Sequence, residues 1–449
     1  MSWSQNGVYW RRPLDCHDKM FQSIANAGKP LGREHWLLLG VVRLSFPPSI
    51  NKAETRLRDA WKSLRLRHPD IATELHTDEK RYTPPRNIEV LEMWATDTFH
   101  VESAVSSADE LFSRHLRVAG DTATCHWVPE SRELAIVSSH WRCDGRGMMM
   151  TLHEYLLGLM PNDQQPKLPS FGCEVNGLAP SLDVLMNVPG DKNAEWLRKA
   201  DDLIAPWHEG PPSIGLPAMK GIYPGDTRRI EVRVSRNDTK SLLESCRARR
   251  IRLTAALFAS VVMETAHHQE PHVAATTKYK SWASFDLRKY CPETPHGLPH
   301  AHSLRMLALP LVVDANTDWP SLATSMQSLN SQSFAPGDSD LMFVRVPYVE
   351  KVTKMLEKAI PTTEPNLSNL GVMDNYVQTQ YGVIKVDNPW IAVQMLSSQL
   401  WLHSWSWNGE LHISSCYNEA FYEADFVRKW LEGLVSNLLM NLEIKRQIG

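Results

Sequence analysis

The sequence predicts an α/β or α+β protein built from two comparable lobes. Apolar stretches typical of strands alternate with amphipathic stretches of helical period along the 449 residues. With 43% hydrophobic and 22% charged residues, the composition is that of a chain with a packed core. A region rich in proline and glycine separates two halves that each contain both kinds of element. We therefore place an N-terminal lobe at residues 1–190, a crossover linker at 191–226 and a C-terminal lobe at 227–449.

The first lobe begins with an apolar run at residues 35–46, which predicts a buried strand closed by two prolines. A helix is expected at 49–66, ending at Arg67-His68-Pro69 because the residue before a proline avoids the helical region. Two short apolar runs at 123–128 and 133–140 predict adjacent antiparallel strands. After a glycine turn, residues 148–160 predict a largely buried helix.

The remaining strands and helices are predicted from the same apolar patterns. Strands are expected at 228–234, 279–287, 304–313, 390–396, 400–407 and 410–417, and helices at 194–204, 238–249, 254–267 and 420–442. Thr254 is placed as the cap of its helix. Asn408-Gly409 joins the last two strands and is a strong signal for a two-residue hairpin turn.

Charge and cysteine content exclude several classes of protein. A net charge of −3 gives no general attraction to nucleic acid or anionic lipid, and no apolar run approaches the length of a membrane span. The seven cysteines form no C-x-x-C pair and are widely spaced, which predicts reduced thiols in a cytoplasmic protein. The N-terminus lacks the apolar segment of a secretory signal.

Several common catalytic and cofactor motifs are missing. The sequence contains no phosphate loop of the G-x-x-x-x-G-K type, no G-x-S-x-G elbow and no H-E-x-x-H pair, and it gives no support to dinucleotide binding. His267, His268 and His272 lie near Glu264 and Glu270, but without a nearby cysteine or a further carboxylate we interpret them as a solvated helix end. We expect no metal and no tightly bound cofactor.

The segment from Ser138 to Gly147 is the strongest candidate site. His140 and Asp144 form an H-x-x-x-D pattern followed by a glycine, between a buried strand and a helix. This placement delivers an imidazole to the end of a sheet, where pockets tend to open. The other interpretation is a histidine satisfied in the core, with Asp144 only capping the next helix. Spacing alone supports the two equally.

Residues His140-Trp-Arg-Cys-Asp144-Gly145 resemble the H-x-x-x-D-G motif of the chloramphenicol-acetyltransferase-like superfamily. That superfamily includes nonribosomal-peptide condensation domains, polyketide-associated acyltransferases, fungal trichothecene-type O-acetyltransferases and plant BAHD acyltransferases. Four further segments fall where the family would put them: Leu64 to Ile71 with its R-H-P, Phe285-Asp-Leu-Arg288, Ser368-Asn-Leu-Gly371, and the closing strand and helix after Trp407. The resemblance covers nearly the whole chain. It implies two lobes, each a mixed sheet with flanking helices, and an active site in a channel between them.

Two departures narrow the resemblance. The D-F-G-W-G motif of the plant branch is missing, which disfavours that branch. Ser139 stands where condensation domains usually carry a first histidine, which favours a freestanding acyltransferase.

The resemblance implies a role for each residue of the motif. His140 would be the general base, and Gly145 would let the substrate approach the backbone. Asp144 would orient His140 directly or, as the family suggests, turn away and pair with Arg288, with Asp286 in the same network. Cys143 is interpreted as a buried structural thiol, because nothing in the sequence lowers its pKa.

Other residues are candidates for substrate and cosubstrate binding. Asn369, with its neighbours Ser368 and Gly371, would bind the substrate or stabilise the oxyanion, although a structural amide is as well supported. Arg249 and Arg250 belong to a basic cluster that would bind the phosphates of coenzyme A, or would only favour a helix C-terminus.

The function implied is transfer of an acetyl or short acyl group from acyl-CoA, as cosubstrate, to a hydroxyl of a specialised metabolite. Two alternatives stay open: a freestanding condensation-type enzyme that uses an acyl carrier protein or forms an amide, and a reused fold that catalyses a cyclisation without acyl transfer. The non-enzymatic alternative is a binding or interaction module without catalytic activity.

Overall fold

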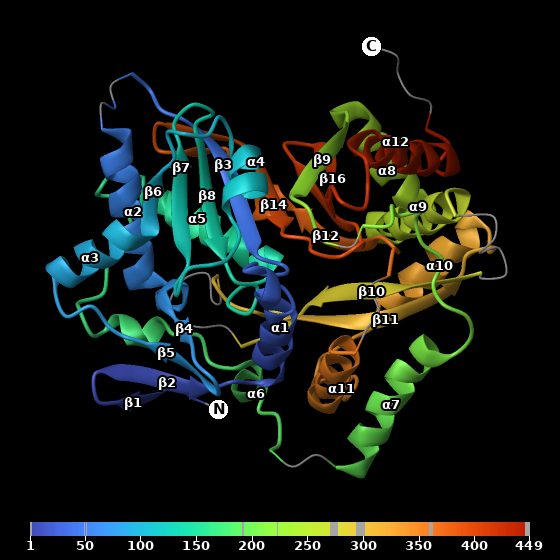
Figure 1. The fold of residues 1–449 in the computed structure, drawn as a ribbon, viewed down its shortest axis with the longest axis horizontal. Coiled ribbons are helices and arrows are strands. Elements are labelled where there is room, and N and C mark those ends of the chain that lie inside the picture. The colour runs from blue at the N-terminus through green and yellow to red at the C-terminus, as the bar shows by residue number, and fades with distance from the viewer. Residues whose placement is uncertain are drawn as a thin grey trace. The chain divides into compact units, whose positions relative to one another are not determined.

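The computed structural model describes residues 2–48, 50, 52–190, 193–221, 223–269, 277–292, 301–358 and 362–444. The chain divides into two compact units, whose elements are labelled in Figure 1. The first comprises Met1–Asp191, Asp286–Met306 and Met373–Gln394, and the second comprises Lys192–Phe285, Leu307–Val372 and Met395–Gly449. Each unit is thus assembled from three segments, whereas the lobes expected from the sequence were contiguous. In particular, residues 286–306 and 373–394 group with the first unit.

A six-stranded sheet forms the centre of the first unit, in the order β13-β14-β3-β8-β7-β6. These strands are β13 (Gln380–Tyr381), β14 (Ile384–Val393), β3 (Leu38–Ser45), β8 (Glu133–Ser138), β7 (Thr124–Val128) and β6 (Phe99–Val101). β3 lies between β14 and β8 and is antiparallel to both. β3 and β8 are almost entirely buried, which is why each reads as a continuous apolar run.

Helices and a small second sheet complete the first unit. The helices include α1 (Cys16–Asn26), α2 (Ala53–Arg67), α3 (Ile88–Thr98) and α5 (Gly145–Leu157), and the small sheet contains β1 (Ser4–Asn6), β2 (Tyr9–Pro13), β5 (Glu79–Tyr82) and β4 (Glu74–Leu75). α5 packs closely on β3, where a Cβ at Gly40 would lie 2.4 Å from Cγ of Met148. This contact fixes the helix that follows the H-x-x-x-D-G segment against the central sheet.

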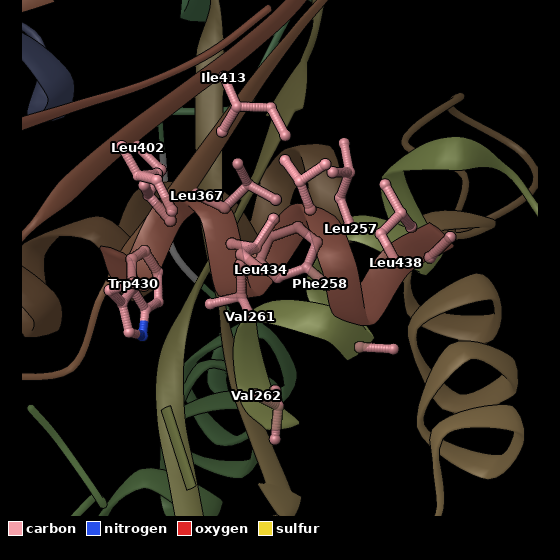
Figure 2. Close-up of a cluster of buried hydrophobic side chains, with 14 of the residues drawn as sticks. Leu257, Phe258, Val261, Val262, Leu367, Leu402, Ile413, Trp430, Leu434 and Leu438 are labelled. Carbon is pink, nitrogen blue, oxygen red and sulfur yellow. The ribbon is translucent and has the colours of Figure 1, made fainter. Parts of the chain in front are cut away.

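The second unit has its own sheet, in the order β12-β15-β16-β9, and its own core. The strands are β12 (Asn366–Val372), β15 (Trp401–Trp407), β16 (Glu410–Asn418) and β9 (Thr227–Val234). Figure 2 shows part of its hydrophobic core, to which β12, β15 and β16 contribute Leu367, Leu402 and Ile413. The unit also contains the helices α7 (Ala194–His208), α8 (Arg236–Ala248), α9 (Leu253–His267), α10 (Trp319–Asn330), α11 (Leu341–Leu356) and α12 (Ala424–Asn441). A separate two-stranded sheet is formed by β10 (Lys278–Asp286) and β11 (Met306–Asp314).

The α/β class is confirmed, and most predicted elements are present within a few residues of their expected bounds. The hairpin turn is also present, since Asn408 and Gly409 have φ of 49° and 81°, the left-handed values that such turns need. The predicted helix cap at Thr254 is wrong: α9 begins at Leu253, with Arg252 at the cap position. No helix in the described ranges combines the length and apolar character that a membrane crossing requires.

Candidate active site

The loop that carries His140 is held at both ends by regular structure. β8 ends at Ser138, and α5 begins at Gly145. Between them the backbone N–H of Arg142 donates to the carbonyl of Ser139 at 3.0 Å, closing a turn. The buried Arg142 side chain donates from Nε to the carbonyl of Thr73 at 2.8 Å and from Nη2 to that of Asp121. The histidine is therefore carried by a turn with little freedom to move.

The His140 imidazole is half-buried among aromatic side chains. The ring of Phe21, from α1, stacks on it with centroids 4.3 Å apart and an interplanar angle of 14°. The ring of Trp36 lies 6.0 Å away in a tilted arrangement. Nδ1 is enclosed and receives no hydrogen bond from any other side chain that the structure describes. Burial lowers the pKa of His140 to about 4, although its own backbone and the charge of Asp144 oppose the shift. The imidazole is therefore neutral near pH 7 and can accept a proton.

Asp144 points its carboxylate away from His140. Oδ1 accepts the N–H of Gly147 at 2.8 Å, which caps α5. Oδ2 accepts the backbone N–H of Arg305 at 2.7 Å, and the Arg288 guanidinium lies 3.0 Å from Oδ1. Burial by itself would raise the pKa of Asp144, but Arg288 and these two N–H groups hold it below its ordinary value. Among the described residues Asp144 makes no hydrogen bond to the imidazole, which favours the structural role over direct orientation of His140.

Three of the residues singled out in the sequence meet in one ionic network. Arg288 Nη1 lies 3.0 Å from Oδ1 of Asp286 as well as from Asp144, and its Nη2 donates to the carbonyl of Ser303 at 2.8 Å. Arg146, one residue before Gly147, reaches the other oxygen of Asp286 at 3.1 Å. The network ties the start of α5 to the segment after β10.

Sequence reasoning missed Gly147, which is tightly packed. A Cβ at Gly147 would lie 2.6 Å from the carbonyl oxygen of Ala301 and 2.8 Å from both Arg288 Nη2 and Cys143 Sγ. Gly145 is the first residue of α5 and is half-buried. A single sequence contains no signal for this crowding, because Ala301 and Arg288 are distant from Gly147 along the chain.

Replacement of Gly147 by alanine should lower the free energy of unfolding by about 1–3 kcal/mol, since a backbone oxygen and a buried guanidinium would have to move. Gly190→Ala, at a position where a Cβ would meet no atom within 4 Å, is the control and should cost less. Denaturant unfolding of both variants tests this. Equal losses at the two positions would show that the packing around Gly147 is less restrictive than described.

Two further polar contacts support the loop and were not anticipated. His302 is buried, with Nε2 3.2 Å from Ser138 Oγ and Nδ1 3.1 Å from Thr151 Oγ1, so it joins the end of β8 to α5. The R-H-P segment at the end of α2 also acts on α5: Arg67 pairs with Glu154, and Nε2 of His68 lies 3.0 Å from the same carboxylate. The ion pairs with Glu154 explain what the R-H-P segment does in this fold, whereas the sequence identified that segment only by its resemblance to the family.

Cys143 is fully buried within the motif. Its Sγ lies 3.2 Å from the carbonyl oxygen of Asp144, and burial raises the pKa of the thiol well above its ordinary value. A thiol that stays protonated is a poor nucleophile, so the geometry favours the structural interpretation of this residue.

Ser368, Asn369 and Gly371 lie on β12 in the second unit. The side-chain nitrogen of Asn369 donates to Thr254 Oγ1 at 2.6 Å, and its oxygen accepts the N–H of Gly371 at 2.8 Å. Gly371 has φ of +84°, and the pairing of β12 with β15 shifts register between Asn369 and Gly371. The amide thus fixes an irregular strand to the first turn of α9, which favours a structural role over an oxyanion contact.

We expect Asn369→Ala to lower the free energy of unfolding by about 1–3 kcal/mol, because Thr254 and Gly371 would each lose a hydrogen-bond partner. Turnover per folded molecule should stay close to wild type. Thr254→Val removes one of the same bonds, and the two effects should be less than additive in a double-mutant cycle. A fall in turnover of more than tenfold with unchanged stability would instead assign Asn369 to the reaction.

The arginines proposed to bind coenzyme A lie after α8 in the second unit. Arg249 donates from Nη1 to the carbonyl of Asn441 at 3.1 Å, and its Nη2 lies 3.3 Å from Glu443. Arg250 is exposed and has φ of 56°. Arg249 is thus already engaged by the end of α12, and phosphate binding here stays a prediction.

The histidines at the end of α9 do not form a metal site in the part of the chain that is described. His268 Nε2 lies 3.0 Å from Glu264, four residues earlier in the helix, and His272 lies outside the described residues. Within the described ranges there is no group of three or more histidine, cysteine or carboxylate side chains placed to hold a metal ion.

Comparison with known proteins finds similarity to acetyltransferases. No family model matches the sequence. The chain is 28% identical to acetyltransferase pigO of Monascus ruber, over 99% of each protein. It is also 28% identical to O-acetyltransferase pigM of the same organism, over 96% of this chain and 85% of that protein.

Solved structures agree on the fold. The structure superimposes on TRI3 trichothecene 15-O-acetyltransferase from Fusarium sporotrichioides with a TM-score of 0.81 and 14% identity, covering 98% of this chain and 97% of that one. The chain therefore has the chloramphenicol-acetyltransferase-like fold that its H-x-x-x-D-G segment predicts, and over its whole length it is similar in sequence to fungal acetyltransferases.

Proposed function

We propose that this protein transfers an acetyl or short acyl group from acyl-CoA to a hydroxyl of a specialised metabolite. The observation that carries the proposal is the His140 imidazole, which is neutral, half-buried and fixed at the end of a central strand. Relatives named as an acetyltransferase and an O-acetyltransferase, and a structural neighbour that is a 15-O-acetyltransferase, support the reaction class.

The chemistry requires one base and an activated donor. Because Nδ1 is enclosed, Nε2 is the nitrogen that would meet a substrate. It takes the proton of the acceptor hydroxyl while the oxygen attacks the thioester carbonyl. The tetrahedral intermediate then expels the thiolate, the carbon–sulfur bond breaks, and the imidazolium returns the proton to sulfur. The ester and free coenzyme A are the products, and no acyl-enzyme is needed because the thioester is already activated.

The surroundings of His140 favour this use of the ring. Phe21 and Trp36 cover it with apolar surface, which keeps it unprotonated and excludes water from one side. Asp144, Arg288 and Asp286 hold the loop that presents it, so the carboxylate acts on position and not on the proton. The proposal therefore assigns catalysis to one residue and support to the rest.

The low pKa of His140 predicts an unusual pH dependence. A base with a pKa of about 4 is fully available above pH 5.5, so kcat/KM should be flat from there to neutral pH and fall only as the pH approaches 4. Enzyme held at each pH and assayed again at pH 7 controls for unfolding. Phe21→Ala should admit water and move the midpoint upward. A wild-type midpoint near 6.5 would contradict the enclosed environment described for the ring.

The reaction class can be tested without knowing the natural acceptor. Purified protein is incubated with acetyl-CoA and a panel of hydroxylated polyketides and terpenoids, with release of free thiol and acetylated product measured together. A parallel arm replaces acetyl-CoA by an acyl-loaded carrier protein, and a third arm omits any thioester. Product in the first arm supports the proposal. Product confined to the second arm indicates a condensation-type enzyme, and product in the third indicates a cyclisation.

A further inference from the structure

A cavity inside the first unit is lined by buried charges. It is narrow, and only a guest close to the size of a water molecule fits between its walls. Four cationic side chains line it, Arg12, Lys80, Arg142 and Arg305, and each is at most 6% exposed. Charged side chains are seldom buried to this degree without partners.

Two of these cations are compensated. Arg12 Nη2 lies 3.0 Å from Asp18 Oδ2, and Lys80 Nζ lies 2.6 Å from Asp18 Oδ1. Asp15, which caps α1, lies 3.5 Å from Arg12. The charges in this half of the lining are therefore paired, although Arg12 Nε is buried without an acceptor among the described residues.

The other two cations have no carboxylate within 4 Å in the part of the chain that is described. Arg142 and Arg305 instead donate to carbonyl groups, Arg305 to those of Leu304 at 3.1 Å and Pro180 at 2.6 Å. Arg142 Nη1 and Arg305 Nε are buried and have no acceptor among the described residues. Burial lowers the pKa of both guanidinium groups, to about 10 for Arg142, and more distant carboxylates such as Glu34 and Asp15 offset the shift only in part.

The charge balance of the lining favours an anion. The third carboxylate, Asp70, accepts the backbone N–H of Ala179 at 2.9 Å, and burial raises its pKa. Even with Asp70 ionised, four cations face three carboxylates in the lining. Glu34 acts on Arg142 from outside the lining, but burial raises the pKa of that carboxyl and so weakens its compensation. A small anion would accept the two free N–H groups and offset the excess positive charge in the lining, whereas water would satisfy only the hydrogen bonds.

We propose that this cavity binds one small monovalent inorganic anion, such as chloride, between Arg142 and Arg305. The site lies beside the catalytic loop: Arg142 is two residues from His140, and the backbone N–H of Arg305 donates to Asp144. Bound anion therefore stabilises the turn that presents the imidazole. The site is distinct from the acyl-transfer chemistry and does not depend on it.

A thermal titration tests the proposal on the full-length protein. Chloride is raised against gluconate at constant ionic strength, since gluconate is too large to enter the cavity. We expect Tm to rise saturably by about 2 °C or more. The same Tm at every chloride concentration would overturn the proposal.

Variants and diffraction locate the effect. Arg142→Gln and Arg305→Gln should abolish the chloride-dependent shift, whereas Arg114→Gln, which removes an exposed charge, should retain it. Because either cavity variant can fail to fold, crystals of the wild-type protein soaked in bromide provide a second measurement. An anomalous peak between Arg142 and Arg305 supports the site. A bromide-soaked crystal without that peak contradicts it, as does a shift that both cavity variants retain.

Discussion

Replacing His140 with alanine should lower kcat/KM for acyl transfer by about 10²–10⁴. The loss follows from removing the only proton acceptor that the proposed reaction uses. The free energy of unfolding should change far less, because the half-buried ring makes no side-chain hydrogen bond within the described structure and its packing is with Phe21 and Trp36. Activity is measured with acetyl-CoA and an acceptor found in the panel, and unfolding with denaturant.

Two further variants separate catalysis from packing. His140→Gln keeps most of the volume beside Phe21 but provides no base, so its rate should fall as far as that of the alanine variant. His208→Ala removes an exposed histidine at the end of α7 and should leave the rate unchanged. Near-wild-type turnover in either His140 variant would show that another group takes the proton.

Asp144→Ala should yield protein that is largely unfolded or aggregated. The substitution leaves the buried Arg288 with Asp286 as its one carboxylate partner in the described structure, and breaking a buried pair from one side costs about 3–5 kcal/mol. It also removes the cap of α5 and an acceptor for the Arg305 N–H. Together, these losses amount to a large part of the free energy of unfolding of an ordinary domain. Soluble yield, circular dichroism and the unfolding midpoint measure the effect.

Asp318→Ala is the matched control for the capping contribution alone. Asp318 caps α10 by accepting the N–H of Ser321 at 2.9 Å, and it is exposed and has no ion pair among the described residues. Its loss should leave a folded protein with a small decrease in stability. A stable Asp144→Ala protein that is merely slow would contradict the structural role and return Asp144 to the catalytic machinery.

The elements around His140 could be predicted because their signals are local. β8 is a continuous apolar run and α5 has a buried face, although the helix begins at Gly145, within the segment where the glycines predicted a turn. The pairing of Asp144 with Arg288 could be predicted only from the family resemblance, because the spacing in the sequence is equally compatible with a direct contact between Asp144 and His140.

What could not be predicted depends on contacts between distant segments. β14 joins the sheet of the first unit although it follows most of the second in sequence, and no local pattern encodes that partner. α1 was missed although Asp15 and Asp18 form a reciprocal capping box, and with it the stacking of Phe21 on His140. Thr254 was assigned to the cap of α9 by residue type, whereas its hydroxyl is used by Asn369.

One paired assay tests the central claim most directly. Wild-type protein and the His140→Gln variant are given acetyl-CoA and the same hydroxylated acceptor, and free coenzyme A and acetyl ester are measured in each reaction. The account predicts equal amounts of both products with wild type and almost none of either with the variant. Ester formed at the same rate by both proteins, or formed without release of coenzyme A, would contradict it.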